Sequence, residues 1–179
     1  MSEAIILNGK QIQLIIERLS REVIESIHFE NTVIIGVQPR GVLLAEKIKK
    51  RIQELTNNNI PFGKIDTTFH RDDFRRGKSL NAKTTEIEFQ IENKNVLLVD
   101  DVLFTGRTIR AAMDALLSFG RPMKIELLVL MDRRFNRELP IQPDFVGSVV
   151  DTIENVDVEV RWESEENKVN EVVFVKLNE

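Results

Sequence analysis

The sequence predicts an α/β fold in which helices flank both faces of a parallel β-sheet. Three apolar runs of strand length, at 32–37, 95–99 and 124–131, lack the alternation of a half-exposed strand, and such runs are typical of parallel strands that are covered on both faces. Segments with helical spacing separate these runs, which requires the crossover connections of a parallel sheet. A length of 179 residues, 42% of them hydrophobic, suits a single domain over 1–179.

Each expected helix has its own spacing or boundary signal. Asn8 and Gln11 form a capping-box pattern, and apolar residues then recur every three or four positions through 12–27. The same periodicity predicts a helix over 42–55. A third helix is expected over 107–119, where a glycine and a proline follow closely and end it.

The remaining strands are expected in two different settings. Residues 64–70 are rich enough in strand-forming residues to add a further strand to the main sheet. Residues 157–162 and 171–177 each alternate apolar and polar side chains with no helix between them, which predicts an antiparallel pair. The sequence therefore predicts a small β cap on the parallel sheet, too short to be a separate domain.

Composition excludes several classes of protein. The chain has no cysteine, so it can form no disulfide, thiolate metal site or cysteine nucleophile. It contains no apolar run of about 18 residues and lacks the basic-then-apolar layout of a signal peptide, so we expect no membrane segment and a cytoplasmic location. The 25 basic and 29 acidic residues give a net charge of −4, which does not favour non-specific nucleic-acid binding.

The most informative motif is VLLVDDVLFTGRT at 96–108. It joins a buried strand, two adjacent carboxylates and a Thr-Gly-Arg-Thr turn that opens the expected helix. Such a turn directs backbone N–H groups and the positive end of the helix dipole at one point, and Thr105 and Thr108 add hydroxyl groups. Asp100 and Asp101 alone would also suit a solvated strand end. Together with the turn they favour a phosphate and sugar site instead.

A second motif, GVQPRG at 36–41, lies where another expected strand meets its helix. The carboxyl ends of parallel strands face one edge of the sheet, where ligands of such folds bind. We therefore expect a tight turn that brings the Arg40 cation to the same edge as the two carboxylates.

These motifs resemble those of a known family. VLLVDDVLFTGRTIRAAMDAL resembles the phosphoribosyl pyrophosphate (PRPP) signature of type I phosphoribosyltransferases. The flanking segments VQPRG, DTTFHRDD, RELPIQPDFVG and VDVEV resemble the PyrR family in order along the chain. The resemblance implies a type I phosphoribosyltransferase fold with a small β hood, formed mainly by about 138–179, and a flexible loop at about 71–84.

The family's activity would be transfer of phosphoribose from PRPP to uracil, which yields UMP and pyrophosphate with Mg²⁺ as cofactor. The resemblance assigns roles by position. Asp100 and Asp101 would hold the ribose hydroxyls and help to order the metal, and Arg40 would act on the leaving pyrophosphate. The remaining expected positions are, for PRPP, Val102, Leu103, Phe104, Thr105, Gly106, Arg107 and Thr108; for the pyrophosphate loop, Pro39, Arg40 and Gly41; for the flexible loop, Arg71, Asp72, Asp73, Arg75 and Arg76; and for the base and hood, Arg133, Phe145, Val146, Gly147 and Val158.

Two of these positions carry a further interpretation. Phe104 stands where purine-using relatives have a carboxylate, and a phenyl ring cannot accept a proton, which favours a pyrimidine base. Phe145 could cover the face of the base or simply belong to the hydrophobic core, and the sequence leaves both interpretations open.

The family also implies an alternative function and further partners. PyrR proteins regulate pyrimidine genes through leader RNA and form dimers or tetramers, so a UMP-responsive RNA-binding regulator is the alternative to an enzyme. The first 30 residues hold three basic residues against five acidic ones, so the first helix lacks the expected basic face. We therefore favour the enzyme. A third hypothesis is a sensor that binds UMP without catalysis.

Overall fold

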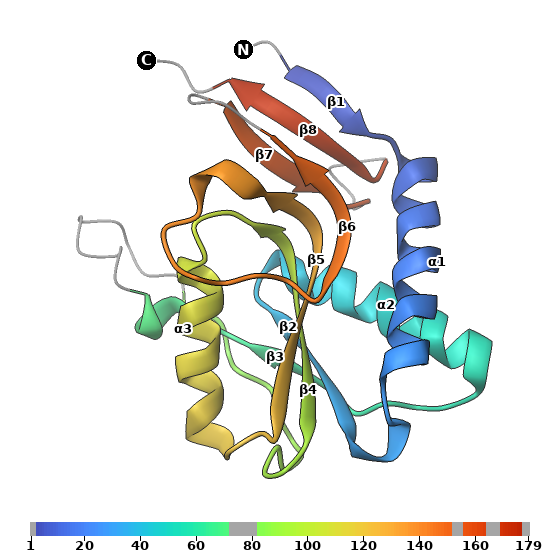
Figure 1. Cartoon of the computed structure of the whole chain (residues 1–179), viewed down its shortest axis with the longest axis vertical. Helices are drawn as coiled ribbons and strands as arrows, with labels where there is room; N and C mark the ends of the chain where they lie inside the picture. Colours follow the sequence, from blue (N-terminus) through green and yellow to red (C-terminus); the bar gives the residue numbers. More distant parts are fainter. Residues whose placement is uncertain (1–2, 72–81, 152–155, 164–168, 177–179) are drawn as a thin grey trace.

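The computed structural model describes residues 3–71, 82–151, 156–163 and 169–176, and it shows an α/β molecule with a second, smaller sheet (Figure 1). The main sheet has five parallel strands in the order β3-β2-β4-β5-β6. Its strands are β2 (Thr32–Val37), β3 (Phe62–Ile65), β4 (Asn95–Leu103), β5 (Lys124–Arg133) and β6 (Phe145–Val150). The predicted α/β class with a parallel sheet is confirmed.

Helices cover both faces of this sheet. α1 (Gly9–Ser26) and α2 (Arg40–Thr56) lie on one face, and α3 (Arg107–Leu116) lies on the other (Figure 1). Alternate strand residues separate the core into two layers, because Leu97 and Val99 of β4 pack with α1 and α2 whereas Val96 and Leu98 pack with α3. The predicted capping box at the start of α1 is present.

The smaller sheet contains both ends of the described chain. β1 (Glu3–Leu7), β8 (Glu171–Lys176) and β7 (Val156–Arg161) form an antiparallel sheet in the order β1-β8-β7. We call this sheet the hood. The antiparallel pair of β7 and β8 follows the prediction, whereas β1 is an addition. Phe145–Val150, expected in the hood, instead forms the edge strand β6 of the main sheet, because it pairs in parallel with β5.

Several boundaries differ from those expected, and pairing explains them. β4 continues past Val99 to Leu103 because Val102 and Leu103 still pair with β5. The strand expected over 64–70 is shorter and earlier, Phe62–Ile65, where it pairs with β2, and Thr68–His70 forms a 3-10 turn. α2 begins at Arg40, two residues before the expected start, so the turn after β2 consists of little more than Gln38 and Pro39.

Among the described residues, no helix has both the length and the apolar composition that crossing a membrane would require.

We expect Leu98→Ala to destabilise the protein by about 2–5 kcal/mol, because it leaves a cavity in the layer between β4 and α3. Leu98 is fully buried, whereas Leu117 at the end of α3 is 61% exposed. Leu117→Ala is therefore the matched control and should change stability by less than about 0.5 kcal/mol. Urea unfolding followed by circular dichroism measures both changes, and equal losses in the two variants would contradict this account of the core.

Candidate active site

The adjacent carboxylates Asp100 and Asp101 lie inside β4, close to its carboxyl end. They were expected at the end of the strand, but pairing of Val102 and Leu103 with β5 encloses them. Only 6% of Asp100 and 8% of Asp101 is exposed. The backbone N–H of Asp101 donates to Asp100 Oδ1 (2.9 Å), and that of Val102 donates to Asp101 Oδ1 (2.8 Å). Two carboxylates are thus held in a nearly dry strand by backbone donors.

Burial raises the pKa of both carboxyl groups. For Asp100 the neighbouring Asp101 carboxylate adds to this increase, since one negative charge disfavours another close by. For Asp101 the positive charge of Arg40 offsets part of the effect of burial. A buried pair with raised pKa values is costly to ionise, and such pairs are typical of sites that receive a cation or donor from a ligand.

The carboxylate pair also fits a divalent cation. Asp101 Oδ2 is buried and accepts no hydrogen bond from any residue that the structure describes. Carboxylate oxygen is the ligand that Mg²⁺ prefers, and this ion usually takes one or two protein carboxylates together with water and substrate phosphate. No group of three or more acidic or histidine side chains suited to a metal occurs in the described ranges. Substrate oxygens and water would therefore complete the coordination of an ion bound here.

A cavity of 400 Å³ lies directly beyond the carboxylates, where β4 turns into α3. Residues 102–109 line it, together with Arg71 and Glu138. Gly106 has a φ of 91°, a left-handed conformation that glycine adopts readily, and α3 begins at the next residue. The helix therefore directs its positive dipole end at this cavity, and the Arg107 N–H donates to Thr105 Oγ1 (3.3 Å). Binding of phosphate here stays a prediction.

Arg40 reaches the same edge of the sheet from α2, where it is the first helical residue. The preceding Gln38–Pro39 peptide bond is cis. Gly41 allows the helix to approach β4, because a Cβ atom there would lie 2.5 Å from the carbonyl oxygen of Val99 and 2.9 Å from Asp100 Cα. This close approach places the Arg40 charge near Asp101, where it affects the pKa of that carboxyl group.

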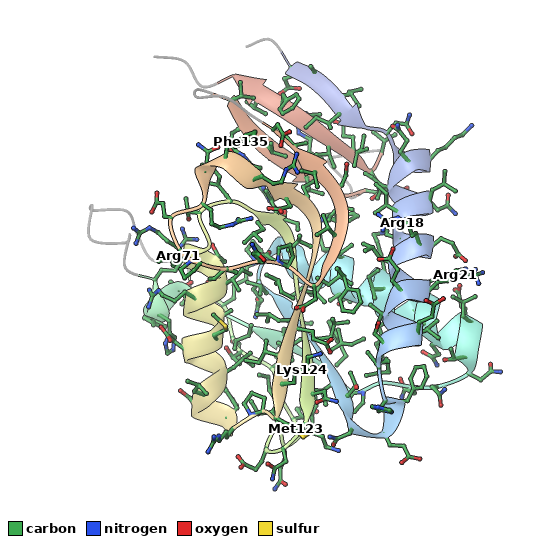
Figure 2. The ribbon with its side chains drawn as sticks, viewed as in Figure 1. Arg18, Arg21, Arg71, Met123, Lys124 and Phe135 are labelled. Carbon is green, nitrogen blue, oxygen red and sulfur yellow. The ribbon has the colours of Figure 1, made fainter. Side chains whose placement is uncertain are left out.

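Arg71 is the one residue of the predicted flexible-loop set that the structure describes. It lines the 400 Å³ cavity, and its charge opposes part of the rise that burial causes in the pKa of Asp100. Figure 2 shows it beside α3, on the opposite side of the molecule from Arg18 and Arg21 of α1. Asp72, Asp73, Arg75 and Arg76 lie outside the described residues, so their assignment stays a prediction.

Arg133 and Phe104 close the site on the side of the hood. The guanidinium carbon of Arg133 lies 3.9 Å from the centre of the Phe104 ring, a stacked cation–π contact. Arg133 also donates to Asp157 Oδ1 (2.9 Å) and to the carbonyl oxygen of Val156 (2.8 Å), both on β7. Arg133 is 5% exposed and Phe104 38% exposed, so the ring presents one open surface.

The other expected base-contacting residues lie elsewhere. Phe145 is 7% exposed and belongs to the hydrophobic core on the α1 face, so its core interpretation is the one the structure favours. Gly147 packs against β5 and Ile15, and Val146 lines a separate surface hollow. Val158 is buried in the core, because on an alternating strand its neighbours Asp157 and Glu159 take the outward positions.

Sequence reasoning missed three acidic residues that the fold brings to this site: Glu138, Asp157 and Glu159. Asp157, Glu159 and Arg161 occupy alternate positions of one strand, so they share a face, and this polar face was the available signal. No such pattern marks Glu138. It reaches Arg107 because its backbone N–H bonds to the carbonyl oxygen of Thr105.

Solved structures share this architecture at low sequence identity. A hypoxanthine-guanine phosphoribosyltransferase from Bacillus anthracis matches with a TM-score of 0.71 and 17% identity, over 97% of this chain and 99% of that one. A hypoxanthine phosphoribosyltransferase from Staphylococcus aureus matches with a TM-score of 0.66 and 23% identity, over 82% and 77% of the two chains. These similarities confirm the predicted phosphoribosyltransferase fold.

Curated relatives are much closer in sequence. A protein of Desulfosudis oleivorans named "Bifunctional protein PyrR" is 52% identical over 82% of each chain, and one of the same name from Actinobacillus pleuropneumoniae is 42% identical over 99% of each. Residues 2–165 match the phosphoribosyl transferase domain family. By these similarities, which cover most of its length, the chain belongs to the PyrR family of phosphoribosyltransferases.

Proposed function

We propose that the protein is a uracil phosphoribosyltransferase that uses PRPP to convert uracil into UMP and pyrophosphate. The observation that carries this proposal is the meeting of three groups at one sheet edge. They are the buried Asp100–Asp101 pair, the cradle over 102–109 and the Arg40 guanidinium. These groups match the three parts of PRPP, namely its ribose hydroxyls, its 5′-phosphate and its pyrophosphate.

The 5′-phosphate would bind in the cradle, where the first N–H groups of α3 lack partners within the helix and can donate to phosphate oxygens. Arg107 and Thr108 line the same cavity and supply side-chain donors. The ribose hydroxyls would then lie over β4 and donate to Asp100 and Asp101. Those carboxylates already have two backbone donors, so ligand hydroxyls would supply the rest.

The reaction needs no covalent nucleophile. Loss of pyrophosphate leaves positive charge on the anomeric carbon, so the protein must stabilise the leaving anion and hold the base in line. Arg40 would bind the leaving group with a bidentate guanidinium, and the carboxylates beneath the ribose would stabilise the developing positive charge. Electrostatic preorganisation is therefore the main contribution of this chain.

Asp100 and Asp101 would hold Mg²⁺, which would neutralise pyrophosphate charge when bound. The unsatisfied Asp101 Oδ2 and the raised pKa values of both carboxyl groups fit this role. A nearby cation lowers the pKa of a carboxyl group, so bound Mg²⁺ would offset part of the cost of burial and favour the charged form, which accepts hydrogen bonds from the ribose hydroxyls.

The preference for uracil rests on the Arg133–Phe104 stack. The Phe104 ring offers a flat apolar surface at the base end of the site, and it cannot take a proton from a purine ring nitrogen. Arg133 is held by Asp157 and remains a donor-only group, which suits the carbonyl oxygens of a pyrimidinedione.

An RNA-binding regulator is the second candidate, because the curated relatives are named bifunctional. Arg18 of α1 does reach β6, where it donates to the carbonyl oxygens of Val146 and Gly147 (3.0 and 2.6 Å). Such a regulator would need five arginines to form one basic face, but each of them has an acidic partner within the chain. The pairs are Arg18–Glu22, Arg21–Glu17, Arg133–Asp157, Arg134–Asp151 and Arg137–Asp132. This internal neutralisation favours the enzyme.

The proposal is tested by a PRPP-dependent assay of pyrophosphate release with uracil, orotate, hypoxanthine and guanine. We expect uracil to be the preferred base and Arg40→Ala to lower kcat/KM for PRPP by on the order of 10², comparable to loss of one preorganised donor. A preference for a purine would contradict the interpretation of Phe104. Binding of UMP with no turnover of any base would indicate a nucleotide sensor instead.

Asp101→Asn should stabilise the ligand-free protein while abolishing its response to Mg²⁺ and PRPP. Removal of a buried, unsatisfied charge should raise Tm at neutral pH by about 2–4 °C, equivalent to about 1 kcal/mol. The gain should disappear as pH falls through the raised pKa of the wild-type carboxyl group, because the wild type then becomes neutral too. Thermal unfolding with and without Mg²⁺ and PRPP measures both effects. Asp114→Asn, at a half-exposed pair with Arg110, is the control and should show no gain.

For the second candidate, we expect pyrimidine-operon leader RNA to bind no more tightly than unrelated RNA in filter-binding titrations, with or without UMP. Arg21→Ala and Lys124→Ala form a matched pair, since their side chains are 60% and 58% exposed but lie on α1 and at the start of β5 (Figure 2). Sub-micromolar, sequence-specific binding that Arg21→Ala weakens and Lys124→Ala leaves intact would establish the regulator.

A further inference from the structure

Both arginines at the proposed phosphate subsites are paired with a glutamate of the same chain. Arg40 Nη2 lies 3.2 Å from Glu159 Oε1, and Arg107 Nε lies 2.6 Å from Glu138 Oε2. Neither glutamate belongs to the PRPP motif or to the pyrophosphate turn. Each comes from a separate element, β7 of the hood or the segment after β5, and meets its arginine only in the folded chain.

A network across the hood holds Glu159 in position. Its second carboxylate oxygen lies 3.3 Å from Arg161, which also contacts Glu3 of β1 (2.7 Å) and Glu171 of β8 (3.4 Å). Arg161 thereby ties all three hood strands together. The carboxylate that faces Arg40 is therefore placed by the whole small sheet rather than by a freely rotating side chain.

The turn between β4 and α3 holds Glu138 in position. The backbone N–H groups of Glu138 and Leu139 both donate to the carbonyl oxygen of Thr105 (3.0 and 3.2 Å). The side chain of the neighbouring Arg137 donates to the carbonyl oxygen of Phe104. Glu138 also lines the 400 Å³ cavity in which the 5′-phosphate would bind. A negative side chain thus stands within a site whose other features attract anions.

The exposure of these pairs makes them easy to exchange. The four side chains are between 34% and 49% exposed, and ion pairs of this kind contribute little to stability because water competes with them. A phosphate group carries more charge than a carboxylate and can bond equally well to a guanidinium through two oxygens, so it should displace the glutamate at low cost.

We propose that Glu159 and Glu138 are internal counter-ions that occupy Arg40 and Arg107 between turnovers. Each takes the place of one phosphate group, Glu159 that of pyrophosphate and Glu138 that of the 5′-phosphate. They act as positioning residues, because they hold each guanidinium at its subsite when no ligand is bound. They also compete with the products, which weakens product binding and favours release. This inference rests on the proposed phosphoribosyltransferase function.

Binding of pyrophosphate and of UMP, measured separately by isothermal titration calorimetry with Mg²⁺, tests the proposal. Glu159→Gln should bind pyrophosphate about 3- to 5-fold more tightly and UMP as the wild type does, and Glu138→Gln should show the opposite selectivity. Tighter binding distinguishes competition from a merely structural role, since structural damage would weaken binding.

Glu171→Gln is the matched control. It removes the same charge from the same hood network, but Glu171 pairs with Arg161, at 3.4 Å, rather than with Arg40. It should leave both affinities unchanged. If all three variants bound both ligands more tightly by the same factor, the cause would be a general charge effect and the proposal would be overturned. Unchanged or weaker binding of the ligands by Glu159→Gln and Glu138→Gln would also overturn it. A wild-type protein that binds neither ligand would overturn the proposed function together with this inference.

Discussion

Burial of two adjacent carboxylates in the central strand of the sheet is the constraint on which the rest of the site depends. Asp100 and Asp101 can remain there because backbone N–H groups bond to them and the charge of Arg40 lies close by. That arrangement needs α2 to start against β4, which Gly41 allows. The ligand-free fold therefore bears an unfavourable burial that a ribose, a cation or both would relieve, as is common where function requires a strained local environment.

Much of the fold could be predicted because its signals are local. The buried runs at 95–99 and 124–131 and the capping box at Asn8 each depend on a few neighbouring residues, and each appears in the structure. The turn from β4 into α3 was predictable for the same reason, since one continuous motif builds it. β1 and the placement of β6 were not, because a short apolar strand acquires its sheet and its direction from distant partners.

The same distinction applies to the site. Val158 was assigned to the base by resemblance and Phe145 to either the base or the core, and both pack in the core, because strand alternation and pairing decide which way each side chain points. Glu138 and Glu159 were missed because their roles come from contacts across 31 and 119 positions of the chain. A motif reveals site residues when they lie in one continuous segment of the sequence. The residues that pair with them or orient them come from other parts of the chain, so only the folded structure reveals these.

The pairing of β1 with β8 has a consequence for the order in which the molecule is completed. Glu3 lies opposite Val175, so the hood joins the two ends of the described chain. Contacts between distant positions form late, because the entropy of closing a long loop must be overcome first. The parallel sheet and its phosphate cradle can assemble from the middle of the chain, whereas Glu159 can face Arg40 only after the hood has closed. During synthesis, the proposed anion-binding half of the site would therefore exist before Glu159, its proposed counter-ion, reaches Arg40.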